Sequence, residues 1–295
     1  MAEIQKIGVL GCGLMGHGIT QVAAQSGYDV VVREVSQEKL DKGIGRIDKQ
    51  LSRAVEKGRM EQDDADAVKG RITPTVDYGD LADSDLVVEA ITEDLGLKLE
   101  MWKEVDAIAK PEAFFATNTS SLPVIDQAAS TGRPEKFLGL HFFNPPQVMR
   151  LLEVVRADPT GDEAVELGFE VGGRLRKTSV AAKDNRGFIV NRLLVPYMLD
   201  GIRAYEEGVG SIEDIDQAIV AGSGNPMGPL TLSDFVGLDT LASIADIMVG
   251  AYGDQRFSQP DSLRALVDAG HYGRKSGRGF YDYTGETPVA VDPSS

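Results

Sequence analysis

The sequence predicts an α/β protein with two domains, a doubly wound N-terminal domain and an all-helical C-terminal domain. Three observations support this fold class. Short apolar runs alternate with helical or loop segments through about residue 184, as expected for a parallel sheet covered by helices. A glycine-rich turn follows the first of these runs. After the segment DNRG only helical patterns follow, so we expect domains 1–187 and 188–295.

The first apolar run, residues 4–10, is typical of a buried strand and leads directly into the segment GCGLMGHGI. Glycine has no Cβ atom, so Gly11 suits a tight turn, Gly13 lets the main chain approach a pyrophosphate, and Gly16 allows a helix to pack closely. Strand, turn and helix together predict a Rossmann-type dinucleotide site. The residues predicted to bind the cofactor at this turn are Gly11, Gly13, Leu14, Met15 and Gly16.

The second apolar run, residues 30–32, ends in Arg33 and Glu34. Glu34 lies roughly 20 residues beyond the glycine motif, where a carboxylate accepts hydrogen bonds from the ribose hydroxyls of NAD. The sequence therefore predicts NAD as the cofactor. Arg33 suits the 2′-phosphate of NADP, which stays the alternative at this corner.

Residues 36–58 are predicted to form one long amphipathic helix. Its apolar face comprises Leu40, Ile44, Ile47, Leu51 and Val55. Its basic face comprises Lys39, Lys42, Arg46, Lys49, Arg53 and Lys57. Acidic residues partly neutralise the basic face, so the pattern alone fits a solvated surface and an anion-binding surface equally well.

Further apolar runs predict strands in the rest of the first domain, and these lie at residues 85–91, 114–116, 137–143, 151–155 and 179–182. In the second domain helices are predicted over residues 191–208, 212–221 and 232–249. Ser211 and Asp214 resemble a capping pair at the start of the second of these helices, and Pro196 predicts a kink or an early start in the first. From Thr284 onward the chain is predicted to fray.

The composition limits the classes of function that the protein can have. The chain has 295 residues and a formal net charge of −16, which disfavours nucleic acid or an anionic membrane as a partner. The single cysteine excludes an internal disulfide, and three scattered histidines with that cysteine show no zinc-site spacing, so no metal is expected. No apolar run approaches the roughly 20 residues of a membrane span, and we expect a cytoplasmic protein.

Two segments carry candidate catalytic residues. NTSSL follows an apolar run and presents Ser120 and Ser121, one of which is expected to cap the next helix. GLHFFNPP places His141 at the end of a predicted strand, the edge at which an α/β sheet usually binds its ligand. Glu153 lies within the apolar run LLEVV, and a buried carboxylate needs a partner, for which His141 is the nearest candidate. The alternative interpretation is a core histidine and an edge-strand glutamate without catalytic roles.

A histidine held by a carboxylate is suited to general base catalysis, because the carboxylate fixes the tautomer of the ring. Beside a nicotinamide such a pair suits the oxidation of an alcohol. The base takes the hydroxyl proton while the hydride leaves carbon for the cofactor.

The chain resembles the short, single-function 3-hydroxyacyl-CoA dehydrogenases, including the 3-hydroxybutyryl-CoA dehydrogenases, over nearly all of residues 4–283. The motifs that carry the resemblance are GCGLMGHGI, LVVEAITED, NTSSL, GLHFFNPP, KDNRGFIVNRLLVPY, GNPMGPLTLSDFVGLDT and GRKSGRGFYDY. The resemblance implies an NAD-dependent enzyme that interconverts (S)-3-hydroxyacyl-CoA and 3-ketoacyl-CoA. It also implies a homodimer that pairs through the helical domain.

The resemblance further implies roles for individual residues. The catalytic set is a substrate-polarising Ser120, the catalytic His141, its orienting Glu153 and the active-site Asn191. Contacts to NAD are implied for Glu93, Lys98, Ser120, Asn144 and Lys275, and contacts to the CoA phosphates for Arg53 and Lys57, with Ser120 and Asn191 also against the substrate. The chain departs from the family pattern at Glu34, where aspartate is common, and at His17, where a smaller residue is common.

Two rival functions stay open from the sequence. One is a β-hydroxyacid dehydrogenase of the hydroxyisobutyrate type, which uses a lysine as the acid and base, and the His141–Glu153 pair argues against it. The other is a non-catalytic NAD-binding or structural protein on the same fold. The intact set of Ser120, His141, Glu153 and Asn191 argues against that one.

Overall fold

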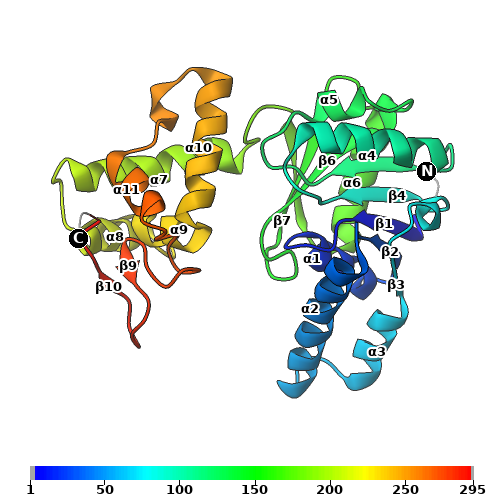
Figure 1. Ribbon diagram of the computed structural model, residues 1–295, viewed down its shortest axis with the longest axis horizontal. Coiled ribbons are helices and arrows are strands. Elements are labelled where there is room, and N and C mark those ends of the chain that lie inside the picture. Colours follow the sequence, from blue (N-terminus) through cyan, green and yellow to red (C-terminus); the bar gives the residue numbers. More distant parts are fainter. Residues whose placement is uncertain (1–3, 294–295) are drawn as a thin grey trace. The chain divides into compact units, whose positions relative to one another are not determined.

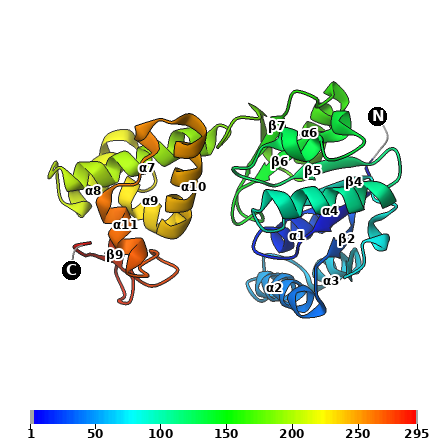
Figure 2. The ribbon, with the colours of Figure 1, turned by 45° about the horizontal axis from the view of Figure 1, so that its top comes forward.

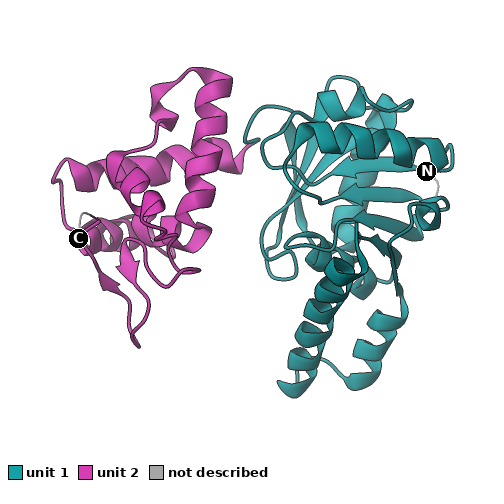
Figure 3. Ribbon diagram, viewed as in Figure 1, with its two compact units in different colours: residues 1–188 teal, residues 189–295 magenta. Residues whose placement is uncertain are grey.

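The computed structural model describes residues 4–293. The chain divides into two compact units, of which the first ends at Phe188 and the second begins at Ile189 (Figure 3). Unit 1 is built around a sheet, and unit 2 is built from helices. Each unit encloses its own hydrophobic core.

Unit 1 contains one eight-stranded sheet in the order β3-β2-β1-β4-β5-β6-β7-β8. Its strands are β1 Lys6–Leu10, β2 Asp29–Arg33, β3 Ile72–Thr75, β4 Leu86–Glu89, β5 Phe114–Thr117, β6 Phe137–Phe142, β7 Leu151–Arg156 and β8 Thr178–Lys183. The first six are parallel, whereas β7 runs antiparallel to β6 and parallel to β8. The first six strands therefore end at one common edge of the sheet.

Helices cover both faces of this sheet (Figures 1 and 2). They are α1 Gly16–Gln25, α2 Gln37–Glu56, α3 Gln62–Gly70, α4 Leu95–Ile108, α5 Val124–Ala128 and α6 Asp162–Arg174. One buried cluster packs α1, α2, α3 and α6 against the sheet, and a second packs α4 and α5, with Trp102 stacked on Phe115, against the other face. The predicted doubly wound fold is confirmed.

The structure adds β3 and α3 to the predicted elements. The strand β3 has the sequence ITPT and lies half-exposed at the edge of the sheet. An edge strand tolerates the proline, which has no N–H group to donate. Such a strand has neither apolar continuity nor alternation, which is why the sequence did not indicate it. The predicted helix over residues 36–58 is α2, and Ser36 caps it by accepting a hydrogen bond from the Lys39 amide.

Unit 2 consists of α7 Val190–Glu206, α8 Ile212–Ser223, α9 Pro229–Val236, α10 Leu238–Tyr252 and α11 Asp261–Asp268, with a short hairpin of β9 Tyr281–Asp282 and β10 Val289–Ala290. The predicted cap of α8 is confirmed, because Ser211 Oγ accepts a hydrogen bond of 3.1 Å from the Asp214 amide. Helix α7 continues through Pro196. The helical second domain is thus confirmed, and the structure adds the unpredicted helix α11 and the hairpin.

Two predictions for unit 2 are wrong. The single helix expected over residues 232–249 is divided at Gly237, whose φ of 101° is accessible to glycine and ends α9 before α10 begins. The chain beyond Thr284 does not simply fray, since Val289 and Ala290 pair with the strand at Tyr281.

Two buried carboxylates hold the C-terminal segment to the helices of unit 2. Asp234 of α9 accepts hydrogen bonds from the amides of Phe280 and Tyr281 at 3.0 and 2.9 Å and from the Tyr283 hydroxyl at 3.1 Å. Asp216 of α8 accepts one from the Tyr281 hydroxyl at 2.9 Å. Burial raises the pKa of Asp234 from 3.8 to about 6, although these hydrogen bonds oppose the shift.

Within residues 4–293 no individual helix combines the length and the apolar character needed to cross a membrane. In this part of the chain, one bent pair of helices, α9 and α10, satisfies both criteria when taken together, and the two meet at an angle of 95°.

Candidate active site

The glycine motif forms the connection from β1 to α1, and each glycine has a different steric reason. Gly11 has a φ of +92°, and a Cβ atom there would lie 2.7 Å from the carbonyl oxygen of Ala90. A Cβ atom on Gly16 would lie 1.8 Å from the carbonyl oxygen of Gly11, so only glycine lets α1 begin so close to the turn. A Cβ atom on Gly13 would meet nothing within 4 Å. The backbone is therefore open on the side of Gly13, as the approach of a pyrophosphate requires.

Glu34 follows the end of β2 at the same sheet edge. Its two carboxylate oxygens accept hydrogen bonds from the amides of Cys12 at 3.0 Å and Val35 at 2.8 Å. A carboxylate has about four acceptor sites, so oxygen lone pairs are left for ribose hydroxyls. The amide of Cys12 thereby also ties Glu34 to the glycine turn.

A cavity of about 350 Å³ opens beside Glu34. Its apolar wall is formed by Val35, Tyr78, Ile91, Leu97 and Met101. The guanidinium of Arg33 lies 3.8 Å from the centroid of the Tyr78 ring, and Arg33 Nε donates to the Val76 carbonyl. The chemistry of this cavity suits an adenosine, with a flat apolar surface for the base and a carboxylate for the ribose. Tyr78 was not found from the sequence, because it lies outside every motif.

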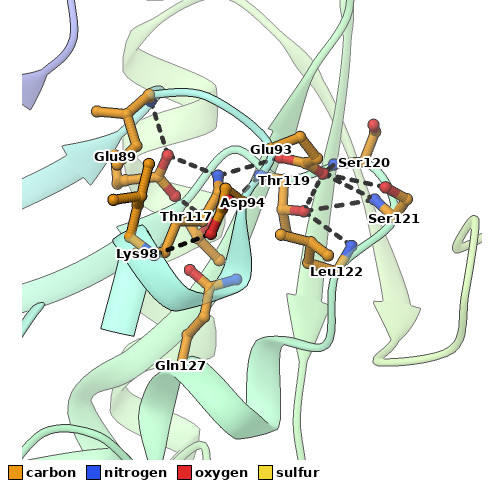
Figure 4. Close-up of polar contacts among 12 residues, drawn as sticks. Glu89, Glu93, Asp94, Lys98, Thr117, Thr119, Ser120, Ser121, Leu122 and Gln127 are labelled. Atoms are coloured by element: carbon orange, nitrogen blue, oxygen red, sulfur yellow. Dashed lines mark hydrogen bonds and ion pairs between the residues drawn. The ribbon is translucent and has the colours of Figure 1, made fainter. Parts of the chain in front are cut away.

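Glu93 lies after β4 and accepts a cluster of hydrogen bonds from the loop that follows β5 (Figure 4). Its Oε1 accepts from the Thr119 hydroxyl, from the Ser120 amide at 3.1 Å and from the Ser121 hydroxyl at 3.1 Å. Burial by itself would raise the pKa of Glu93, but the nearby Lys98 ammonium and these hydrogen bonds outweigh it and hold the pKa below its ordinary value. Glu93 is therefore ionised at neutral pH and fixes the loop that carries Ser120.

Lys98 in α4 is almost completely buried and connects two carboxylates (Figure 4). Its Nζ lies 2.6 Å from Glu89 and 3.1 Å from Glu93. Glu89, at the end of β4, also accepts hydrogen bonds from the Ile91 amide and the Thr117 hydroxyl. The ammonium thus neutralises the buried Glu89 and the partly exposed Glu93. A contact from Lys98 to NAD stays a prediction. Glu89 was missed, although a carboxylate at the end of the run LVVE was a signal of the same kind as Glu153.

His141 and Glu153 lie on neighbouring antiparallel strands and are direct partners in the register of β6 and β7. His141 Nδ1 is 2.6 Å from Glu153 Oε2, and both side chains are buried. The rings of Phe143 and Phe188 lie 4.6 and 5.4 Å from the imidazole centroid. A carboxylate accepts only, so Nδ1 carries the hydrogen and a neutral ring leaves Nε2 free to take a proton. The pairing predicted from the sequence is present, in the geometry of a general base with its orienting acid.

Ser120 and Asn144 lie on the loops that follow β5 and β6. Ser120 is half-buried, and its hydroxyl points away from the Glu93 carboxylate (Figure 4). Asn144 is exposed. Neither serine of NTSSL caps α5, contrary to expectation, because the first amides of that helix, Val124 and Ile125, donate to Asp184 instead.

Two predicted site residues belong to unit 2. Asn191 lies in the first turn of α7 and is half-buried. Lys275 is exposed, and its Nζ lies 2.5 Å from the carboxylate of Asp239.

Arg53 and Lys57 lie in the last turn of α2 and at its C-cap, and both are exposed. Within residues 4–293 neither forms an ion pair, whereas Asp48 of the same helix pairs with Lys69 of α3. His17, in the glycine motif, is buried against the Gly13 carbonyl and the Gln50 side chain.

The loop between β6 and β7, residues 143–150, is fixed by contacts that the sequence did not indicate. Lys177 Nζ donates to the carbonyl oxygens of Pro146 and Met149. The Gln147 side chain donates to Gln21 of α1 at 3.3 Å. These partners are more than 25 residues apart in the chain, so no local pattern could have predicted them.

Comparison with known proteins identifies the family. The model of the 3-hydroxyacyl-CoA dehydrogenase NAD binding domain matches residues 6–185, and that of the C-terminal domain of the same enzymes matches residues 187–283. The chain belongs to the 3-hydroxyacyl-CoA dehydrogenase family. It is accordingly an oxidoreductase with NAD as its cofactor.

Individual members of the family are similar over almost the whole chain. A probable 3-hydroxybutyryl-CoA dehydrogenase of Deinococcus radiodurans is 46% identical over 278 residues, which cover 94% of this chain and 100% of the relative. A 3-hydroxybutyryl-CoA dehydrogenase of Mycobacterium tuberculosis is 45% identical and covers 95% of this chain and 99% of its own length. The crystal structure of (S)-3-hydroxybutyryl-CoA dehydrogenase from Ralstonia eutropha, 35% identical, superimposes with a TM-score of 0.91 and covers 96% of this chain and 100% of its own.

Proposed function

We propose that this dehydrogenase interconverts (S)-3-hydroxyacyl-CoA and 3-ketoacyl-CoA with NAD, and that its preferred pair is 3-hydroxybutyryl-CoA and acetoacetyl-CoA. The observation that carries the proposal is the 2.6 Å contact between His141 Nδ1 and Glu153 Oε2. It lies at the end of β6, on the sheet edge that also carries the open glycine turn. The names of the relatives support the four-carbon substrate.

NAD supplies the hydride acceptor of the reaction. In the oxidative direction His141 Nε2 takes the proton of the substrate hydroxyl while the C3–H bond breaks and its electron pair leaves with the hydrogen. The Nδ1–H group donates to Glu153 throughout, so the positive charge that develops on the ring faces a carboxylate. In the reductive direction the same nitrogen returns the proton to the oxygen of the 3-keto group.

The remaining assignments are part of the same proposal. The Ser120 hydroxyl polarises the substrate oxygen, which is consistent with a loop held by Glu93 and a hydroxyl directed away from it (Figure 4). Asn191 of unit 2 contacts the substrate. Glu93, Lys98, Asn144 and Lys275 contact NAD, and Arg53 and Lys57 contact the CoA phosphates. The homodimer and the cytoplasmic location expected from the sequence also stay predictions.

The test is the oxidation of NADH with acetoacetyl-CoA, followed by the loss of NADH absorbance, with a series of longer 3-ketoacyl-CoA substrates beside it. We expect turnover that is fastest with acetoacetyl-CoA. A faster rate with a longer acyl chain would refute the substrate preference alone. A folded protein that binds NADH and turns over no 3-ketoacyl-CoA would refute the enzymatic proposal in favour of the non-catalytic alternative.

A further inference from the structure

A second cavity lies in unit 1, apart from the cavity beside Glu34. It has a volume of about 560 Å³ and lies between the C-terminal end of α1, helix α3, the loop 143–150 and the chain after α6. None of the residues assigned to NAD or to proton transfer lines it. Its volume is within the range of about 300–1,000 Å³ that is typical of small-molecule sites.

The cavity is basic although the protein is acidic. Its charged lining residues are Asp64, Arg71, Arg150, Arg176 and Lys177, four cations against one carboxylate. The whole chain has 30 basic and 46 acidic side chains, so a random patch of surface carries the opposite sign. Clustered cations in a concave site focus a positive potential that favours an anionic ligand.

The cations of this cavity are poorly neutralised by the protein. Lys177 Nζ contacts two neutral carbonyl groups, and burial lowers the pKa of this lysine. Arg150 and Arg176 form no ion pair within residues 4–293. Arg71 has a partner in Asp29 at 3.4 Å, in an exposed position. A bound anion would offset the cost of holding these charges together.

Arg176 occupies a backbone position that favours glycine. Its φ is 55°, in the left-handed region, at the turn that ends α6. The amides of Arg176 and Lys177 close that turn on the carbonyls of Gly173 and Gly172. A non-glycine residue in this conformation is strained, because its Cβ atom crowds the backbone. Glycine would relieve the backbone strain at this position. The chain instead has an arginine there, which adds a cation to the cavity wall.

The lining also has an apolar part, beside the polar side chains of Gln25, Ser26 and Gln147. Val22, Val68 and Leu175 are buried, and Met60 is half-buried against the same core. An inorganic ion alone would leave this part of the cavity without a partner. A ligand with a flat, weakly polar body and a phosphate would satisfy both parts of the lining.

We propose that this cavity binds a phosphorylated ligand of nucleoside size, with its phosphate held by Arg150, Arg176 and Lys177. Two sources supply this chemistry, a free nucleotide or the nucleotide end of the CoA thioester, and the second rests on the proposed function. Met60 lines the cavity three residues after Lys57, so the basic end of α2 leads toward it along the chain.

Binding is measured by titration calorimetry with adenosine 3′,5′-bisphosphate on the whole protein, saturated with NAD so that the cavity beside Glu34 is occupied. The variant is Arg150→Ala with Arg176→Ala, and the matched control is Arg156→Ala with Arg264→Ala, two arginines paired with exposed acids elsewhere. We expect affinity to fall on the order of tenfold or more in the first variant and to stay unchanged in the control. No saturable binding by the parent protein, or equal affinity in both variants, would overturn the proposal.

The single variant Arg176→Gly tests the same phosphate contact without destabilising the fold. Glycine relieves the left-handed backbone, so this variant is expected to be at least as heat-stable as the parent while it loses affinity for the bisphosphate. Unchanged affinity in this stable variant would count against a phosphate contact from Arg176 and overturn the assignment.

Kinetics then identify the source of the ligand. If KM of the double arginine variant rises for acetoacetyl-CoA but not for a short acetoacetyl thioester without the nucleotide, the cavity holds the end of CoA. If neither KM changes while bisphosphate affinity falls, the ligand is a free nucleotide. Both results support the cavity. Bisphosphate binding by a parent protein without turnover would refute the proposed function and leave this inference standing.

Discussion

His141 and Glu153 face each other across β6 and β7, with Nδ1 and Oε2 2.6 Å apart and both side chains buried. If His141 is the general base, His141→Gln removes the proton acceptor while it keeps a polar side chain of similar reach. We expect kcat to fall by on the order of 10²–10⁴ and NADH affinity to stay nearly unchanged. Stopped-flow turnover and NADH fluorescence titration measure the two quantities. Near-normal turnover would rule out His141 as the base.

Glu153→Gln keeps the shape of the orienting side chain but removes its charge. The imidazolium that forms during alcohol oxidation then has no carboxylate beside it, and the ring can flip because an amide also donates. We expect slower turnover and a changed pH–rate profile. The profile is measured in both directions with saturating cofactor. A variant whose profile superimposes on that of the parent would show that Glu153 does not act through His141.

The corner formed by Glu34 and Arg33 predicts a preference for NADH over NADPH. The Glu34 carboxylate accepts from ribose hydroxyls and repels a 2′-phosphate, while Arg33 is held on the Tyr78 ring. We expect Glu34→Gln to raise the ratio of kcat/KM for NADPH to that for NADH. Tyr78→Ala, which frees Arg33 and leaves Glu34 intact, is the matched comparison. A parent enzyme that prefers NADPH would mean that Arg33 controls this corner.

Arg53 and Lys57, at the exposed end of α2, are predicted to contact the CoA phosphates, far from the reacting carbon of the substrate. Replacing both Arg53 and Lys57 with alanine is expected to lower kcat/KM for acetoacetyl-CoA, mostly through a higher KM. The loss is expected to correspond to only about 1–2 kcal/mol of binding free energy, because an exposed phosphate contact is screened by solvent and salt. The effect is expected to shrink as ionic strength rises. The same loss on an acetoacetyl thioester that lacks the nucleotide would show that these residues are a solvated surface.

Asp234 predicts a pH dependence of unit 2. Its pKa is about 6 in the folded protein and 3.8 as an ordinary side chain, so the folded state binds the proton more tightly. The stability that this group contributes is therefore fully present below about pH 4 and is lost as pH rises through about 6. We expect the hydrogen-exchange protection factors of the Phe280 and Tyr281 amides to fall across this window.

Asp234→Asn is the control for that measurement, because it has no titrating group at this position. Its protection factors are expected to be lower throughout and to change less between pH 4 and 6 than those of the parent. Protection that rises with pH in the parent, or falls equally in both proteins, would contradict the assignment to Asp234.

The parts of the site that the sequence predicted are those with local signals. The glycine turn follows one strand and Glu34 follows another. His141 and Glu153 interrupt apolar runs with groups that need partners. The network of Glu89, Glu93 and Lys98 and the contacts of Lys177 depend on packing between distant segments, which no periodicity encodes. The break at Gly237 escaped because apolar residues continue on both sides of it at helical spacing.

The antiparallel pairing of β6 and β7 makes the alignment of His141 with Glu153 independent of the loop that joins the two strands. The alignment of His141 with Glu153 is set by the ladder of the two strands and does not depend on the length of the eight-residue loop between Phe142 and Leu151. A grafted loop of another length would keep the proton-transfer pair as long as the ladder holds. A slip of one position within β7 would instead set Leu152 or Val154 against the imidazole and turn Glu153 to the opposite face. The loop can therefore change in length without loss of the pair, whereas the register of β7 cannot shift.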